Sequence, residues 1–146
     1  MVEERLAELE EAVTALVAVA RALPDPNAVT TAEWTARDVL AHLVFWHESF
    51  ARNVADLAAG RRPTPLSGTY AALAARTRTE LGGLGIEALI ARLMEAQGVI
   101  RGSVGDPTIT LIPYRRGSRP YPPEEHLAVV RDHVRAHTRE LAEPRT

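Results

Sequence analysis

The sequence predicts an all-α protein: a four-helix bundle with one additional shorter helix and a long loop before the last helix. Apolar residues recur at spacings of three and four in four long segments, which indicates amphipathic helices. Stretches rich in Pro and Gly separate these segments, and only the short run 108–112 has a β-like composition. At this length, we expect residues 1–146 to form a single helical-bundle domain.

The first two helices are expected at about residues 2–22 and 35–60. The prolines of LPDPN end the first helix because proline cannot continue a helical hydrogen-bond ladder. Thr31 and Thr35 are the two candidate N-caps of the second helix. That helix carries a long apolar stripe on one face and ends in the turn-rich loop GRRPTPLSG.

Three further helices follow with different degrees of amphipathicity. The segment 69–81 is rich in Ala and weakly amphipathic, and GGLG ends it. The segment 86–104 has a strong helical pattern, and the loop VGDPTITLIPYRRGSRPYPP after it contains too much Pro and Gly to be helical. The last helix is expected from about 122 to 141, with proline in its first turn and Pro144 beyond its end. Long connections of this kind indicate that not every neighbouring pair is a simple hairpin.

The composition excludes several classes of protein. A net charge of −2 gives no basic surface for nucleic acid, and no apolar run approaches the roughly 18 residues that a membrane span requires. The acidic start MVEERLAELEE is unlike a signal peptide, so we expect a cytoplasmic protein. The chain has no Cys, and its 17 basic residues are all Arg, which excludes thiolate and Schiff-base chemistry by its own side chains. Histidines, carboxylates, hydroxyls, arginines or a bound ion must therefore supply any chemistry.

The last expected helix carries two histidines one turn apart. His133 and His137 lie on the same face, where two imidazoles can chelate one ion. The alternative is a pair of surface or partly buried histidines with no ligand. A metal site needs a third ligand from another helix, and His42 and His47 both flank the apolar stripe of the second helix. The spacing does not decide between them.

Two motifs resemble those of a known superfamily. WTARDVLAHLVFWHE (34–48) resembles the second-helix signature of the DinB/YfiT-like four-helix-bundle superfamily, and DHVRAHTREL resembles its last-helix H-x3-H. The loop PYRRGSRPYPPEEHLAVVRDH is similar to that of the ClbS/DfsB-type branch. The resemblance implies a divalent-metal site formed by His42, His133 and His137. For three imidazole ligands we expect Zn²⁺ or Ni²⁺.

This resemblance implies a small-molecule metalloenzyme, either a hydrolase that acts on an electrophile or a thiol-dependent transferase with a thiol cosubstrate. Two alternatives stay open: a metal-free binding or stress-response module that sequesters a ligand, and a structural or dimerising bundle. A homodimer is compatible with each of them.

Several other residues are candidates for roles around the metal. His47 is a candidate acid or base next to the centre, and Asp38 and Asp132 are candidates to orient the imidazoles. Candidate substrate-binding residues are the aromatic, basic and imidazole side chains of Trp46, Arg115, Arg116, Arg119 and His126. For each of them, packing or a solvated position is the alternative reading.

Overall fold

The structure is a computed structural model that describes residues 1–29 and 34–143. Within these ranges the chain forms helices and no strand, which confirms the all-α prediction. Four helices are long and one is short, as predicted, and their bounds are α1 Val2–Arg21, α2 Ala36–Ala58, α3 Tyr70–Leu81, α4 Ile86–Ser103 and α5 Pro123–Ala142.

Local capping sets where α2 begins and ends. The Thr35 hydroxyl accepts a hydrogen bond from the backbone N–H of Asp38, whose carboxylate accepts one from the backbone N–H of Thr35, each at 3.1 Å. This reciprocal pair is a capping box, so Thr35 is the N-cap, while Thr31 lies outside the described residues. Past the other end, Gly60 takes a φ of 74°, which glycine adopts without a side-chain clash.

The loop before α5 is pinned by backbone pairs. The expected β-like run 108–112 is not a strand: Ile112 instead exchanges single backbone hydrogen bonds with Tyr121, at 2.7 and 3.0 Å. The run has no second strand-like segment to pair with, and Pro113 follows it directly, so a ladder cannot extend. The backbone N–H of Arg116 also donates to Leu66 at 2.7 Å, which ties this loop to the one after α2. At the far end of α5, Pro144 lies outside the described residues.

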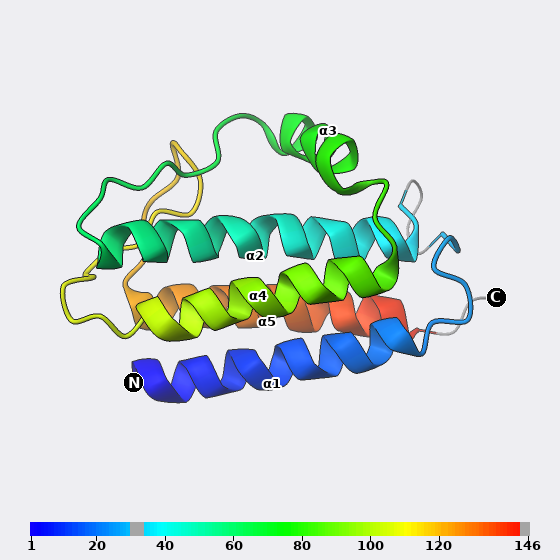
Figure 1. Cartoon of the computed structure of the whole chain (residues 1–146), viewed down its shortest axis with the longest axis horizontal. Coiled ribbons are helices and arrows are strands. Elements are labelled where there is room, and N and C mark those ends of the chain that lie inside the picture. Colours follow the sequence, from blue (N-terminus) through cyan, green and yellow to red (C-terminus); the bar gives the residue numbers. More distant parts are fainter. Residues whose placement is uncertain (30–33, 144–146) are drawn as a thin grey trace.

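The helices form two pairs of parallel neighbours (Figure 1). α1 and α5 run in one direction and α2 and α4 run in the other. α3 lies over α2 in the long connection that returns the chain to the end where α2 begins, so that α4 runs parallel to α2. α2 packs mainly against α4, α1 packs mainly against α5, and α2 touches α5 much less. The expectation that not every neighbour is a simple hairpin is confirmed. α2 and α5, which carry the histidines, therefore meet along a seam between the two pairs.

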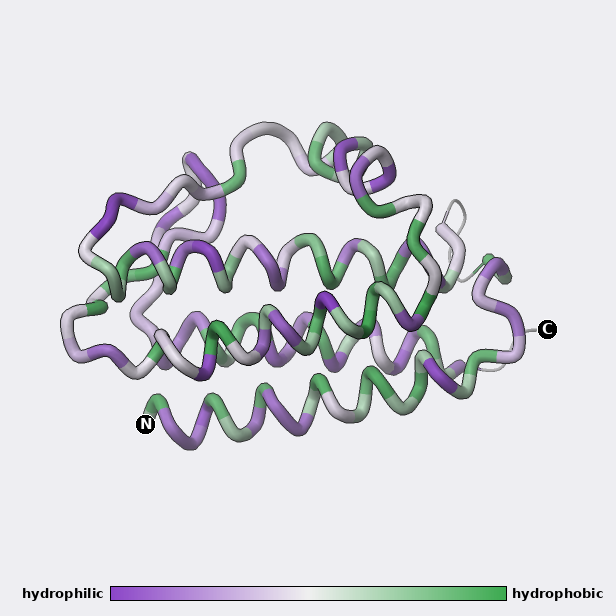
Figure 2. Tube along the Cα trace, in the orientation of Figure 1, coloured by the Kyte–Doolittle hydropathy of each residue, from purple (hydrophilic) through white to green (hydrophobic). Residues whose placement is uncertain are grey.

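Apolar side chains fill the space between the helices. Hydrophilic and hydrophobic residues alternate along the long helices in Figure 2, as expected for helices with one buried face. Many of the fully buried side chains are leucines from four helices, such as Leu9, Leu16, Leu40, Leu93 and Leu127. No helix among the described residues is long and apolar enough to cross a membrane.

Candidate metal centre

Three imidazoles converge across the seam between α2 and α5. Nε2 of His133 lies 3.3 Å from Nε2 of His42 and 3.1 Å from Nε2 of His137. One ring nitrogen from each residue lies within 4.8 Å of the other two, and all three side chains are half-buried. Of the two histidines of α2 between which the spacing did not decide, the structure brings His42 to the C-terminal pair.

Two of these nitrogen–nitrogen distances match those around a divalent cation. Imidazole nitrogens at 2.0–2.1 Å from a tetrahedral ion would be about 3.3 Å apart. Burial, followed by the neighbouring His133 and His137, lowers the pKa of His42 to about 3. Burial and then His137 lower the pKa of His133 to about 4. Both rings are therefore neutral near pH 7 and present lone pairs, the form that binds a metal. The residues present fit such an ion.

A carboxylate on α5 orients one of the rings. His137 Nδ1 lies 2.9 Å from Glu140 Oε2, so its N–H donates there and Nε2 is left as the free ligand atom. Asp38 and Asp132, the carboxylates expected in this role, do not fill it. Asp38 belongs to the cap of α2, and Asp132 pairs with Arg131 at 2.9 Å. The i, i+3 spacing after His137 is the sequence signal that would have pointed to Glu140.

His47 stands apart from the three-histidine cluster. Five residues after His42, it is turned about 140° further around the helix, and its side chain is 2% exposed. Its Nε2 lies 2.7 Å from Oε1 of Gln97 on α4, so the ring donates to the amide oxygen. Burial is the main cause that lowers the pKa of His47 to about 4. Gln97 could not be identified from the sequence, because a single polar residue on an apolar helix face carries no spacing signal.

His126 is the second buried histidine outside the cluster. It is 1% exposed and lies against Phe50, with ring centroids 4.3 Å apart. Tyr114 and Tyr121 also contact the ring, at centroid distances of 5.6 and 5.9 Å. Burial lowers the pKa of His126 to about 4, although an interaction with the backbone of Ile112 acts in the opposite direction. Its Nδ1 has no hydrogen-bond partner among the described residues.

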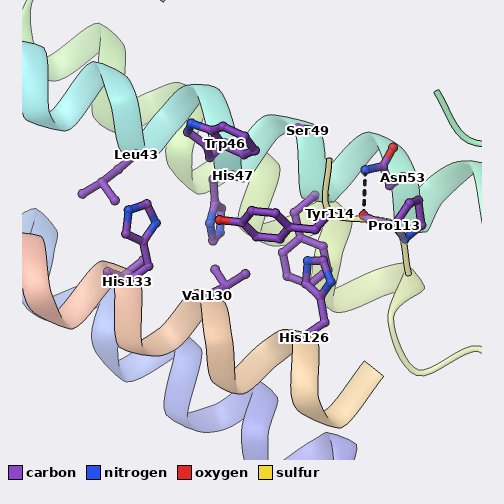
Figure 3. Close-up of a pocket in the computed structure, with 12 residues that line it drawn as sticks. Leu43, Trp46, His47, Ser49, Asn53, Pro113, Tyr114, His126, Val130 and His133 are labelled. Carbon is purple, nitrogen blue, oxygen red and sulfur yellow. Dashed lines mark hydrogen bonds between the residues drawn. The ribbon is translucent and has the colours of Figure 1, made fainter. Parts of the chain in front are cut away.

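A cavity of about 20 Å³ lies beside the cluster, between α2 and α5. In Figure 3, His133 and His126 stand on either side of Val130 along α5, with His47 and Tyr114 opposite them. The stacked rings of Trp46 and Tyr114, with centroids 5.3 Å apart, form part of its wall. Burial is the main cause that raises the pKa of the Tyr114 hydroxyl to about 12, so the hydroxyl keeps its proton. Trp46 and His126 thus line a cavity, as a substrate-binding residue would.

The predicted arginines do not line this cavity. The Arg115 guanidinium lies 4.5 Å from the Tyr70 ring centroid and donates to the carbonyl of Gly68 at 2.9 Å. Arg119 lies 4.2 Å from the Tyr121 ring centroid and pairs with Glu125. Arg116 is exposed and contributes its backbone N–H to the loop pairing described above. Two of these guanidiniums hold the loops together, and substrate binding by any of the three stays a prediction.

Comparisons with known proteins agree with this architecture. The model of the mycothiol maleylpyruvate isomerase N-terminal domain family matches residues 6–145. A crystal structure of the mycothiol-dependent maleylpyruvate isomerase is similar, with a TM-score of 0.76 at 17% identity, and so is that of a histidine-to-alanine mutant, with 0.76 at 18%. Each match covers 100% of this chain but only 62% of the other chain, so the present chain spans less than two thirds of these proteins.

No curated protein sequence matches the chain. The family match confirms the DinB/YfiT-like superfamily predicted from the motifs of α2 and α5, while the suggestion of the ClbS/DfsB-type branch stays a prediction. Since the family model covers nearly all of the sequence, the chain belongs to the mycothiol maleylpyruvate isomerase N-terminal domain family.

Proposed function

We propose that this chain is the metal-binding helical domain of a thiol-dependent enzyme that acts on a small electrophilic molecule. In this proposal His42, His133 and His137 hold Zn²⁺ or Ni²⁺. The observation that carries it is the meeting of three imidazole nitrogens, at distances of 3.1 and 3.3 Å, although His42 and His133 lie 91 residues apart in the sequence. Three protein ligands leave coordination positions open, which is typical of catalytic rather than structural sites.

Each part of the site has a role in this chemistry. When bound, a divalent ion supplies Lewis acidity that lowers the pKa of a coordinated thiol or water. Glu140 fixes the His137 tautomer by accepting from Nδ1, so that Nε2 keeps its lone pair. The stacked pair Trp46 and Tyr114 shields the neighbouring cavity from water. A thiol held here is ionised at lower pH, which makes it a more abundant nucleophile toward an electrophilic carbon.

The thiol-dependent reaction is favoured over the alternatives. The family is named after a mycothiol-dependent isomerase, and this chain has no Cys to supply a sulfur of its own. A cosubstrate such as mycothiol would supply it. A hydrolase would use the same three histidines with water as the nucleophile, but no comparison names one. Sequestration is the weaker alternative, because it gives the three converging imidazole nitrogens no role.

Metal binding followed by thiol binding tests the proposal. Purified protein stripped with a chelator and titrated with Co²⁺ or Zn²⁺ is expected to bind about one ion per chain. The His137→Ala variant is expected to lose at least tenfold in affinity. Arg135→Ala, an exposed change on the same helix, is the matched control and is expected to bind like the wild type. Adding a thiol to the Co²⁺ protein is then expected to shift its visible absorption bands.

Two outcomes would contradict the proposal in different ways. Affinity that is equal in the wild type and in His137→Ala would remove the metal centre. Tight metal binding with cobalt bands that no thiol shifts would keep the centre and reject the thiol-dependent reaction, leaving hydrolysis as the better candidate.

A further inference from the structure

We propose that two copies of this chain associate through α4, with the outer face of α4 of each copy seated in the groove between α2 and α4 of the other. The groove has a volume of about 520 Å³, and its lining among the described residues comes from these two helices. None of the three clustered histidines belongs to that lining. The inference therefore goes beyond the proposed function and does not depend on it.

The floor of the groove is made of small apolar side chains. Ala51 and Ala96 are buried there, Ala55 is half-buried, and Val99 is exposed. In Figure 1, α2 and α4 run side by side in the same direction, and α4 lies in front of α5. The groove thus opens on a face that no other helix of the described ranges lines, and a second chain that covers it removes apolar surface from water.

The outer face of α4 is narrow enough to enter such a groove. Its exposed positions include four small residues, Ala88, Ala91, Gly98 and Gly102. Glycine stabilises a helix less than alanine does, and a Cβ built at Gly98 or Gly102 would meet no atom within 4 Å. Nothing in the described part of the chain therefore requires glycine at these two positions. The close approach of a second backbone gives glycine a physical reason there, because the distance between packed helices depends on the side chains at the contact.

The two walls of the groove carry opposite charges that are not neutralised within the described chain. Glu48 of α2 and Arg92 of α4 already pair with each other, at 2.7 and 2.8 Å. One turn further along, Arg52 of α2 and Glu95 of α4 are both exposed, and neither forms an ion pair with a described residue. Glu48 is the main cause that raises the pKa of Arg92, and Glu95 adds only a small contribution. Arg52 and Glu95 are thus available to a partner.

A second copy of the chain is the occupant that matches both the shape and the charge of the groove. In a two-fold dimer both copies use the same patch, so α4 serves at once as a wall of one groove and as the helix that enters the other. When α4 of one copy lies in the groove, its Glu95 faces the α2 wall, where Arg52 of the other copy lies. The symmetry repeats this pair of opposite charges on the other side of the axis.

Charge reversal on each wall, followed by mixing of the two variants, tests this inference. Sedimentation equilibrium of the wild type is expected to show a monomer–dimer equilibrium. Arg52→Glu and Glu95→Arg are each expected to raise the dissociation constant about tenfold or more, because the symmetry repeats every like-charge contact. Arg135→Glu, the same reversal at an exposed position of α5, is the matched control and is expected to leave the constant unchanged. An equimolar mixture of Arg52→Glu and Glu95→Arg is expected to dimerise again, because each altered charge then faces its opposite.

Native mass spectrometry of the mixture identifies the dimers that contain one copy of each variant by their mass. A wild type that stays monomeric up to millimolar concentration overturns the inference. Dimers of equal strength in the wild type and both variants overturn it too, because association then uses another surface. A mixture that stays monomeric shows that the two charges act within one chain, which is also contrary to the inference. Each of these outcomes leaves the Zn²⁺ affinity of the three-histidine cluster, and with it the proposed function, to its own test.

Discussion

The five histidines line one interior seam but fall into two groups with opposite surroundings. In the cluster of His42, His133 and His137, half-buried ring nitrogens face one another, and a single carboxylate holds one ring. His47 and His126 are almost completely buried. The N–H of His47 donates to Gln97, and Nδ1 of His126 has no hydrogen-bond partner among the described residues. The first group offers converging lone pairs to a cation, whereas the rings of the second group are separately enclosed in the core.

The largest expected effect is on stability at low pH, and it arises in the buried pair. Burial lowers the pKa of His126 from 6.5 to about 4, so between these values the unfolded chain binds more protons than the folded one. The stabilisation is complete above pH 6.5 and is lost as the pH falls toward 4. This one residue contributes up to about 3 kcal/mol to the difference.

Urea unfolding of the metal-free protein from pH 7 to pH 4 measures this effect. In His126→Phe, the fall in the free energy of unfolding between pH 7 and pH 4 is expected to be smaller by about 3 kcal/mol. His42, His47 and His133 have lowered pKa values too, so the pH dependence of the variant is compared with that of the wild type rather than with a flat line. Curves of equal slope would show that burial of His126 costs the protonated ring nothing.

The next largest effect is the stabilisation by a metal ion bound at the three-histidine cluster. Zn²⁺ at 100 times its dissociation constant is expected to raise the free energy of unfolding by about 2.7 kcal/mol. Thermal unfolding with and without Zn²⁺ measures it. His133→Ala is expected to abolish the increase, because its Nε2 is the atom closest to both other nitrogens. The same increase in His133→Ala would place the ion elsewhere in the molecule.

A smaller effect on stability is expected from the hydrogen bond between His47 and Gln97 of α4. Gln97→Leu leaves the N–H of His47 without its acceptor in the core, which is expected to cost about 2 kcal/mol of stability. The double variant His47→Leu with Gln97→Leu is expected to recover part of this loss, because neither polar partner is then stranded. Zn²⁺ affinity is expected to stay at the wild-type value in Gln97→Leu. A large loss of Zn²⁺ affinity in Gln97→Leu would show that the buried histidines are coupled to the three-histidine cluster.

The smallest effect concerns the His137 ring, which donates a hydrogen bond to the Glu140 carboxylate. Glu140→Gln is expected to lower the affinity for Zn²⁺ about tenfold, because a neutral amide holds the His137 tautomer less firmly. Asp132→Asn, which removes a carboxylate paired with Arg131, is the matched control and is expected to leave the affinity nearly unchanged. Calorimetric titration compares the two, and an equal loss in both would attribute the effect to net charge alone.

The fold could be predicted because it depends on signals within single segments. The spacing of apolar residues and the positions of Pro and Gly predicted every helix to within a few residues. The β-like run 108–112 forms no strand, in agreement with the all-α prediction, because a strand needs a partner and no second strand-like segment is present in the sequence. The relative directions of the helices were not predictable in detail, since they depend on how α3 carries the chain back across α2.

Residues of the site were likewise predictable only where the signal lies within a single helix. The i, i+4 spacing identified His133 and His137 as neighbours, but only the family resemblance favoured His42 over His47. The structure supplies the reason, because His47 faces Gln97 on α4. The i, i+3 spacing could have identified Glu140 as a partner of His137. Gln97 and the backbone of Ile112 could not be identified in this way, because they come from elements distant in sequence from the imidazoles that they contact. What the sequence leaves open is which element each histidine meets.

The seam between the two helix pairs also bears on how the chain acquires its site. His42 and His133 are 91 residues apart and belong to different helix pairs, so their approach requires long-range packing between the two pairs. A partly folded chain presents two isolated imidazole sets and no centre. Metal uptake would therefore mark the completion of tertiary assembly, and a refolding experiment that follows cobalt colour would time the last step rather than the first.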